Sequence, residues 1–177
     1  MRVVSFDLSL TSTGWACSDA SMEWGVFNPP PKMRDVERID WIAGQCAEWA
    51  RLAGLVVMED FAFAASNSFA REIAGLTYLF RHWLWKHEKP YVLVAPQSLK
   101  KFIVGRGSTP KNPIPKSCIV KEILKRFGHD TFDDNSADAI GLAYIGRALV
   151  GEWEPTTDAQ REVVAMLAKK YPGVRDV

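Results

Sequence analysis

Residues 3–15 read VVSFDLSLTSTGW, an apolar run that ends in a single acid, Asp7, followed by small hydroxylated residues and a glycine. The run predicts a buried strand over 2–7, and residues 13–18 and 22–27 predict two more strands joined to it by short turns. An acid at the end of a buried strand is suited either to holding a metal ion or to helping to cradle a phosphate. The rest of the chain must distinguish these two roles.

Downstream of these strands, strand and helix patterns alternate along the chain. The apolar run LVVME at 55–59 predicts a central strand parallel to the first, and another strand is expected at 91–94. Pro96 stands where a helix can open at its first turn. Apolar residues at helical spacing predict five further helices, at about 32–52, 66–86, 115–127, 135–149 and 156–171.

This order of elements predicts an α/β fold. We expect a mixed sheet of about five strands, the first three in an antiparallel meander, with helices on both faces. Residues 1–150 are expected to form the main domain, and residues 151–177 a C-terminal helical tail of the same domain.

The composition is that of a globular protein, with 47% hydrophobic and 24% charged residues in a chain of 177. No apolar run approaches the roughly 20 residues that a membrane helix needs, and no basic-then-apolar leader precedes Asp7. We therefore expect no signal peptide and no membrane partner. The three cysteines show no CxxC spacing, which favours free thiols in a reducing cytoplasm and makes zinc unexpected: Cys17, Cys46 and Cys118.

Basic residues concentrate in one segment, although the net charge is only +1. From Lys100 to Arg126, eight basic residues accompany a single acid, Glu122. The middle of this segment, GRGSTPKNPIP at 105–115, predicts an exposed cationic loop. Such a concentration is typical of a surface that contacts phosphates, and a solvated helix face is the alternative.

Three acids stand at the ends of predicted elements. Asp7 ends the first strand, Glu59 ends the LVVME strand, and Asp138 lies near the start of a late helix. Adjacent parallel strands would bring Asp7 and Glu59 to one edge of the sheet, while Asp134, Asn135 and Asp138 share one helix face. Convergent carboxylates repel one another unless a cation compensates. Their oxygen atoms favour Mg²⁺ or Mn²⁺, and two such ions can support phosphodiester hydrolysis.

Each acid also has a purely structural explanation. Asp7 can be a turn residue that binds nearby backbone groups, and Glu59 can belong to an ion pair beyond its strand. Asp134 or Asn135 can cap the late helix, and the helix dipole favours Asp138 in the first turn. The order and spacing of the acids, more than any one of them, point to a metal site.

Four motifs carry a resemblance to a known family. They are FDLSLTSTGWA near the start, VVMEDFAFAASNSFAREIAGL in the middle, VAPQSLKKFIVGRGSTPK before the basic loop, and DDNSADAIGLAYIG near the end. Together they resemble the motifs of RuvC-type Holliday junction resolvases, which belong to the ribonuclease-H-like nuclease superfamily. The resemblance runs from about residue 2 to residue 149 with all motifs in order, and it implies a ribonuclease-H-like fold.

The resemblance implies that Asp7, Glu59 and Asp138 are catalytic metal ligands. Three residues before Asp138 the family usually has Asp or His, whereas this chain has Asn135. An amide oxygen can bind Mg²⁺, but it brings no charge and cannot act as a base. Asp134, one residue earlier, is the alternative fourth ligand.

The resemblance also assigns roles to basic and aromatic residues. Lys100 and Lys116 match basic positions near the scissile phosphate and the DNA backbone, with Lys111 as the alternative to Lys116. Phe61 and Phe63 resemble aromatic residues that lie near unstacked bases, and core packing is the alternative for Phe63. Further candidate DNA contacts in the basic segment are Lys101, Arg106 and Lys111.

The sequence therefore predicts a Mg²⁺-dependent, structure-selective DNA endonuclease that cleaves four-way junctions. We expect two ions in each site, with Mn²⁺ able to substitute, and products with 5′-phosphate and 3′-hydroxyl ends. Because two symmetric cuts need two sites, the resemblance implies a homodimer. The apolar stripe of the helix over 66–86 is expected to be core or the subunit interface: Phe69, Ile73, Leu76, Phe80 and Trp83.

Other functions remain open at this point. A broader branched-DNA or flap endonuclease, or a non-catalytic junction-binding module, could share the fold. A sugar kinase or actin-like ATPase would also use a DLSLTSTG-like phosphate loop, but it needs a second, similar half that this chain lacks. We therefore expect no nucleotide cofactor, and we assign Asp7 to a metal.

Overall fold

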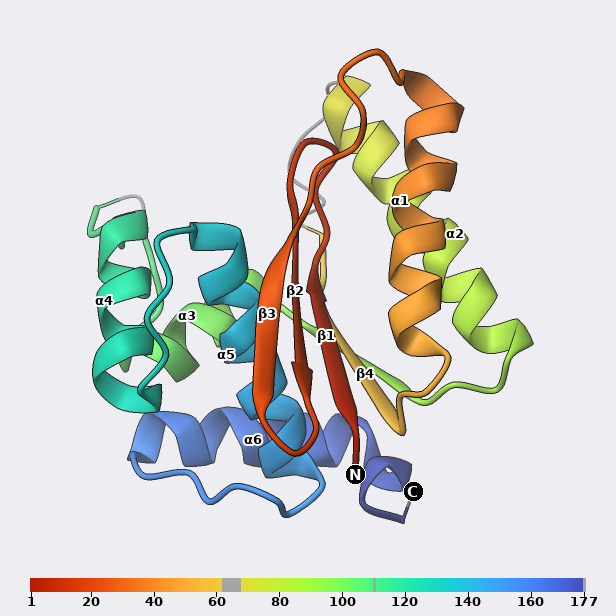
Figure 1. Cartoon of the computed structure of the whole chain (residues 1–177). Coiled ribbons are helices and arrows are strands. Elements are labelled where there is room, and N and C mark those ends of the chain that lie inside the picture. The colour runs from red at the N-terminus through yellow and green to blue at the C-terminus, as the bar shows by residue number, and fades with distance from the viewer. Residues whose placement is uncertain (62–67, 110, 177) are drawn as a thin grey trace.

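The computed structural model describes residues 1–61, 68–109 and 111–176 of the chain (Figure 1). Its sheet has five strands in the order β3-β2-β1-β4-β5. β1, β2 and β3 form an antiparallel meander, and β4 and β5 run parallel to β1. The predicted mixed sheet is confirmed. The strands are β1 (Val3–Asp7), β2 (Thr13–Ser18), β3 (Met22–Phe27), β4 (Leu55–Glu59) and β5 (Tyr91–Val94).

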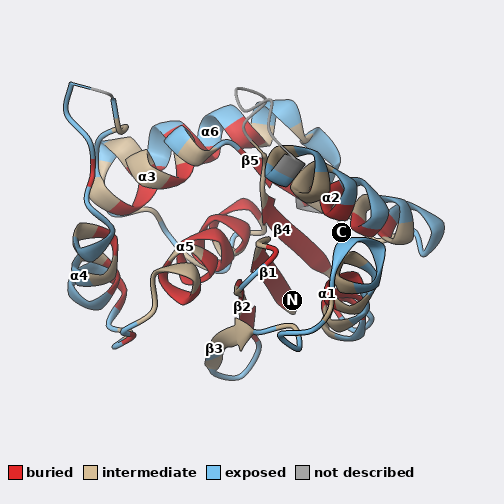
Figure 2. Cartoon of the chain, turned by 90° about the horizontal axis from the view of Figure 1, so that it is seen from above, coloured by how far each residue is buried: buried red, intermediate tan, exposed pale blue. Residues whose placement is uncertain are grey.

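Helices cover both faces of this sheet, as predicted. α1 and α2 pack on one face, and α5 packs on the other with α3, α4 and α6 outside it (Figure 2). The helices are α1 (Asp35–Ala50), α2 (Ser68–Lys86), α3 (Pro96–Val104), α4 (Lys116–Phe127), α5 (Asp134–Leu149) and α6 (Asp158–Lys170), followed by the 3₁₀ helix η1 (Pro172–Asp176).

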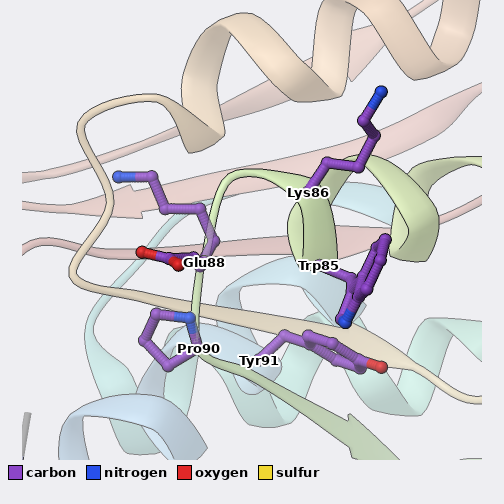
Figure 3. A pocket seen from close by; sticks show the side chains of 6 residues that line it. Trp85, Lys86, Glu88, Pro90 and Tyr91 are labelled. Carbon is purple, nitrogen blue, oxygen red and sulfur yellow. The ribbon is translucent and has the colours of Figure 1, made fainter.

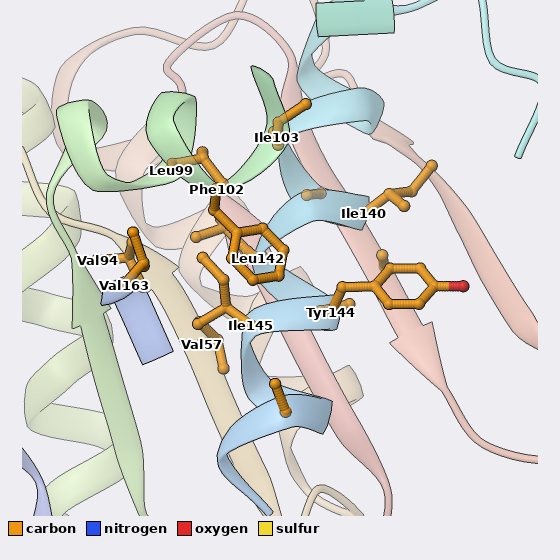
Figure 4. Packing of buried hydrophobic residues seen from close by; sticks show 14 of the residues in the cluster. Val57, Val94, Leu99, Phe102, Ile103, Ile140, Leu142, Tyr144, Ile145 and Val163 are labelled. Atoms are coloured by element: carbon orange, nitrogen blue, oxygen red, sulfur yellow. The ribbon is translucent and has the colours of Figure 1, made fainter. Parts of the chain in front are cut away.

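The two faces of the sheet follow from the alternation of side chains along each strand. In β1, Val3 belongs to the core cluster beneath α5, whereas Val4 and Phe6 belong to the cluster beneath α1 and α2. Figure 4 shows the first cluster, where side chains of α3, α5 and β4 meet. Twelve residues of α5 are buried, so this helix lies inside the molecule and carries Asp138 on a rigid support.

The apolar stripe predicted on the second long helix belongs mainly to the core. Leu76 and Phe80 are fully buried, and the Phe80 ring packs edge-on against Phe6 at 5.3 Å between centroids. Core packing is therefore confirmed for these residues, and they are not available as an exposed subunit interface. Phe69 lies off the buried face and is 52% exposed. Ser66, where the sequence predicts this helix to begin, lies outside the described residues.

The C-terminal segment packs against the main domain. Val163, Val164 and Leu167 of α6 belong to the same core cluster as α3 and α5. All three cysteines are free thiols, as predicted. Among the described residues, no helix combines the length and the apolar character needed to cross a bilayer.

Candidate active site

Asp7 and Glu59 meet at one edge of the sheet. They are the last residues of β1 and β4, which pair in parallel with Phe6 opposite Met58. Because the strands run in the same direction, their carboxyl ends lie side by side (Figure 1). The two carboxyl groups share a hydrogen bond. The predicted convergence of these acids is therefore present in the structure.

The start of α5 lies against the same edge. Asp7 pairs with Gly14 of β2, and a Cβ atom at Gly14 would overlap the backbone carbonyl of Asn135. Only a glycine permits this approach between the strand and the first turn of the helix. The Thr-Gly pair of the first motif thus places α5 beside Asp7.

The N-cap of α5 is Asp133. Its Oδ1 accepts a hydrogen bond from the backbone N–H of Ser136 at 2.8 Å, as an N-cap side chain does. The expectation that Asp134 or Asn135 could cap this helix is therefore wrong. The side chain of Asp134 instead pairs with Lys116.

Asp138 is an acid in an unfavourable environment. Burial, followed by the negative charge of Asp7, raises its pKa to about 7, although Lys100 and Lys116 oppose this shift. Its Oδ1 is inaccessible to solvent and lacks a hydrogen-bond partner among the described residues. A buried carboxylate oxygen without a partner is costly, so this atom is suited to a ligand that brings positive charge.

The same effects raise the pKa values of the two strand-end acids. Burial raises the pKa of Asp7 well above its usual value, and the charges of Glu59 and Asp134 raise it further. Burial also raises the pKa of Glu59, although the hydrogen bond from Asp7 and the charge of Lys100 oppose the shift. At this edge of the sheet, burial first and the neighbouring acids second disfavour the charged form of the carboxyl groups.

Lys100 and Lys116 lie close enough to act on the acids. Lys100, on α3, lowers the pKa of Glu59 and of Asp138. Lys116, the first residue of α4, lowers the pKa of Asp7. Two cations from different helices therefore flank the carboxylates, at the positions where the sequence predicts phosphate contacts.

The other predicted basic contacts differ in their surroundings. Lys101 pairs with Glu162 of α6, which draws its ammonium group toward the outer helix layer. Arg106 donates a hydrogen bond to the carbonyl of Asn112 within the basic loop, at 3.1 Å. Lys111 is exposed on that loop.

A cleft of about 220 Å³ opens beside Asp7 and Glu59. Phe61 lines it together with Ile73 and Thr77 of α2. Phe61 therefore lies beside the acids, and its contact with unstacked bases stays a prediction. Phe63 lies outside the described residues.

The acids form an oxygen-rich group that lacks the arrangement of a preformed metal site. Within residues 1–61, 68–109 and 111–176, no three His, Cys, Asp or Glu side chains converge as a complete ligand cluster. Asp7 and Glu59 instead form a hydrogen bond with each other. The donor types still fit a hard divalent cation, and the free Oδ1 of Asp138 offers a ligand atom.

Sequence reasoning missed Ser5 as a residue that positions the site. Its hydroxyl is fully buried and donates a hydrogen bond to the carbonyl of Ala139 at 2.6 Å. This bond joins β1, two residues before Asp7, to α5, one residue after Asp138. The polar residue inside the apolar run VVSFD was the available signal, because a buried hydroxyl needs a partner.

A larger hollow lies away from the acids. It has a volume of about 760 Å³ and is lined by residues at the end of α2 and the start of β5, with Trp85 beside Tyr91 (Figure 3). Since β5 begins at the amino edge of the parallel strands, this hollow is separate from the carboxylates.

No protein-family model and no curated protein sequence matches the chain. Solved structures do. The Thermus thermophilus RuvC structure covers 88% of this chain and 99% of its own, at 18% identity and a TM-score of 0.63. The chain has the RuvC fold. The T. thermophilus RuvC complex with a Holliday junction substrate gives the same coverage and identity with a TM-score of 0.66.

The RuvC fold is also shared by a viral protein. The fowlpox virus resolvase, solved with Holliday junction DNA, covers 81% of this chain and 94% of its own, at 11% identity and a TM-score of 0.52. The RuvC fold of this chain therefore agrees with the ribonuclease-H-like fold that the sequence motifs imply.

Proposed function

We propose that this chain is a divalent-metal-dependent endonuclease that cleaves four-way DNA junctions. The observation that carries the proposal is the gathering of Asp7, Glu59 and Asp138 at one edge of a RuvC fold, with all three pKa values raised. Carboxylates placed together against their own repulsion are typical of sites that hold cations or move protons. The structural neighbours that were solved with junction DNA support the choice of substrate.

Asp7, Glu59 and Asp138 would hold Mg²⁺ or Mn²⁺, with Asp134 or Asn135 as a fourth ligand. Two bound ions would supply the Lewis acidity that polarises a phosphodiester and stabilises its leaving oxygen. Asp7 would be the central ligand of this set, since the charges of Glu59, Asp134 and Lys116 all act on it. Ion binding would replace the hydrogen bond between Asp7 and Glu59 and would give Asp138 Oδ1 its missing partner.

Lys100 and Lys116 would steady the DNA. Each acts on at least two of the acids, so each ammonium group is within electrostatic reach of a phosphate bound there. They would orient the scissile phosphate and offset the negative charge that develops on it. The products would carry 5′-phosphate and 3′-hydroxyl ends.

Two symmetric cuts require two such sites, so we propose a homodimer. The buried stripe of α2 does not supply the interface, but another face of this helix is exposed. Tyr78, His82 and Trp85 follow the i, i+4, i+7 spacing of one helix face, and all three are exposed. Light scattering of the purified chain tests this assembly, and Trp85→Glu should yield a monomer.

One cleavage experiment tests the proposed activity. The protein is incubated with end-labelled four-way, three-way, flap and linear duplexes, with Mg²⁺, Mn²⁺ or EDTA. We expect junction cleavage with either metal, none with EDTA, and at least a hundredfold loss for Asp7→Asn. Binding without cleavage in both metals would leave a junction-binding module. Equal cleavage of flaps and junctions would widen the activity to branched DNA in general.

A further inference from the structure

Phe132 is presented to solvent on a fixed turn. Its side chain is 95% exposed, although it is a large aromatic residue directly before α5. Its neighbours are held in place on both sides: Thr131 is buried, and Asp133 caps the helix. The backbone N–H of Asp133 also donates to the Thr131 hydroxyl at 3.4 Å. The backbone that carries the ring is therefore held in place, and hydration of the apolar surface of the ring is unfavourable.

The position of Phe132 relates it to the candidate active site. Two peptide units separate it from Asp134, so their Cα atoms are at most about 7 Å apart. Asp134 pairs with Lys116, and its charge acts on Asp7 and Asp138. The start of α5 lies at the end of the sheet where β1 and β4 end (Figure 1). The distance of at most about 7 Å between the Cα atoms of Phe132 and Asp134 corresponds to roughly two nucleotides along one DNA strand.

Phe132 and Phe61 approach this edge from opposite faces of the sheet. Phe61 lines the cleft with residues of α2, whereas Phe132 precedes α5, and these helices cover different faces. A phosphate next to Phe132 is disfavoured, because Asp130 and Asp133 are its close neighbours in the chain. The uncharged face of a nucleobase meets no such repulsion, and aromatic rings bind bases without regard to sequence.

We propose that Phe132 stacks on a nucleobase that is exposed at the branch point, on the α5 side of the carboxylates. The inference rests on the proposed function, since it requires branched DNA at the edge that carries Asp7. It adds a second aromatic contact to the one predicted for Phe61. A base stacked on Phe132 would be drawn away from its partner strand, which favours an opened branch point over a linear duplex.

Photocrosslinking tests the stacking directly. Junctions that carry 5-iodouracil at one position at a time, on both sides of the branch point, are bound to the protein without divalent ions and irradiated. The crosslinked peptide is then identified by mass spectrometry. We expect a crosslink to Phe132 from a position within about two nucleotides of the cleavage site, and none from linear duplexes.

Affinity measurements give a second readout. We expect Phe132→Ala to weaken junction binding about five- to 150-fold, with little change for linear duplexes, and Phe132→Trp to restore it. Leu52→Ala is the matched control. Leu52 is also strongly exposed, at 72%, but it precedes β4 at the other end of the sheet. This control should bind junctions as the unmodified chain does.

The outcomes separate this inference from the function on which it rests. If Phe132→Ala binds and cleaves junctions as well as the unmodified chain, the stacking role is wrong and the nuclease proposal stands. If Phe132→Ala changes the molecular mass in light scattering, the ring contacts a second copy and not a base. If the unmodified chain binds no branched DNA, both proposals fail together.

Discussion

The backbone carbonyl of Asn135 occupies the space that a Cβ atom at Gly14 would fill. This relationship joins two motifs that lie far apart in the sequence. Gly14 pairs with Asp7 across the sheet, and Asn135 belongs to the helix that carries Asp138. The absence of one methyl group therefore allows the acids of the first and last motifs to lie together.

Gly14→Ala should damage both stability and activity. The added methyl group meets backbone and not a flexible side chain, so α5 must shift, at a cost of about 1–3 kcal/mol in the free energy of unfolding. Urea denaturation and junction cleavage measure the two effects. Gly44→Ala is the control, because Gly44 is exposed on α1 with open space around it. This variant should gain up to about 1 kcal/mol, and equal behaviour of the two variants would contradict our interpretation.

The metal-free protein should lose stability as the pH rises. The pKa of Asp138 is about 7 in the fold, compared with an ordinary value of 3.8. The folded state therefore binds this proton more tightly than the unfolded chain. The resulting stabilisation is complete below pH 3.8 and is lost as the pH rises through about 7. Asp138→Asn removes this titration, so its free energy of unfolding in EDTA should fall less steeply between these pH values. Identical slopes for the two proteins would refute the assignment.

Mg²⁺ should reverse this loss of stability at alkaline pH. A ligand that binds only the folded state at about a hundred times its Kd contributes about 2.7 kcal/mol, which raises the Tm of a chain of this size by roughly 5–10 °C. The gain should be smaller at acidic pH, because the ions compete with protons for the same carboxylates. Thermal unfolding with and without Mg²⁺ measures it. A similar gain for Asp7→Asn would place the ions elsewhere.

Lys116 and Lys101 should differ in their effect on cleavage. Lys116 pairs with Asp134 and acts on Asp7, whereas Lys101 pairs with Glu162 on the outer layer. We expect Lys116→Ala to lower the cleavage rate at least tenfold, and Lys101→Ala to change it by less than about fivefold, as exposed ion pairs are weak. Single-turnover rates on a bound junction decide the comparison, and a larger effect at Lys101 would count against the geometry.

Asp134 should be the fourth ligand in place of Asn135. The charge of Asp134 acts on Asp7 and Asp138, while the Cβ atom of Asn135 lies 3.1 Å from the Cβ position at Gly14. Asp134→Asn should abolish cleavage and preserve junction binding, and Asn135→Ala should retain most of the cleavage rate. The reverse pattern would assign the ligand to Asn135.

The order of elements could be predicted because each has a strong local signal. The alternation of apolar residues identified the strands, and the acids at the ends of β1 and β4 followed from the strands themselves. The N-cap of α5 could not be read in this way, because Asp133, Asp134 and Asn135 are all competent caps. Their roles depend on where Gly14 allows the helix to lie and on which acid meets Lys116.

The solvent exposure of individual apolar side chains could not be predicted from the sequence either. Helical periodicity identified the apolar stripe of α2, but it did not show whether α1 or another subunit covers Leu76 and Phe80. The 95% exposure of Phe132 carries no local signal either, since a phenylalanine between threonine and aspartate is ordinary. Such properties arise from packing between segments that are distant in the chain.

The burial of α5 determines when this helix unfolds relative to the rest of the protein. Amide groups at the centre of a helix enclosed on nearly all sides exchange with solvent only when the whole domain unfolds. Asp138, which is repelled by the neighbouring acids, therefore lies on the helix that we expect to unfold last. Hydrogen exchange should find the backbone of α5 among the slowest in the chain, even in solutions without metal.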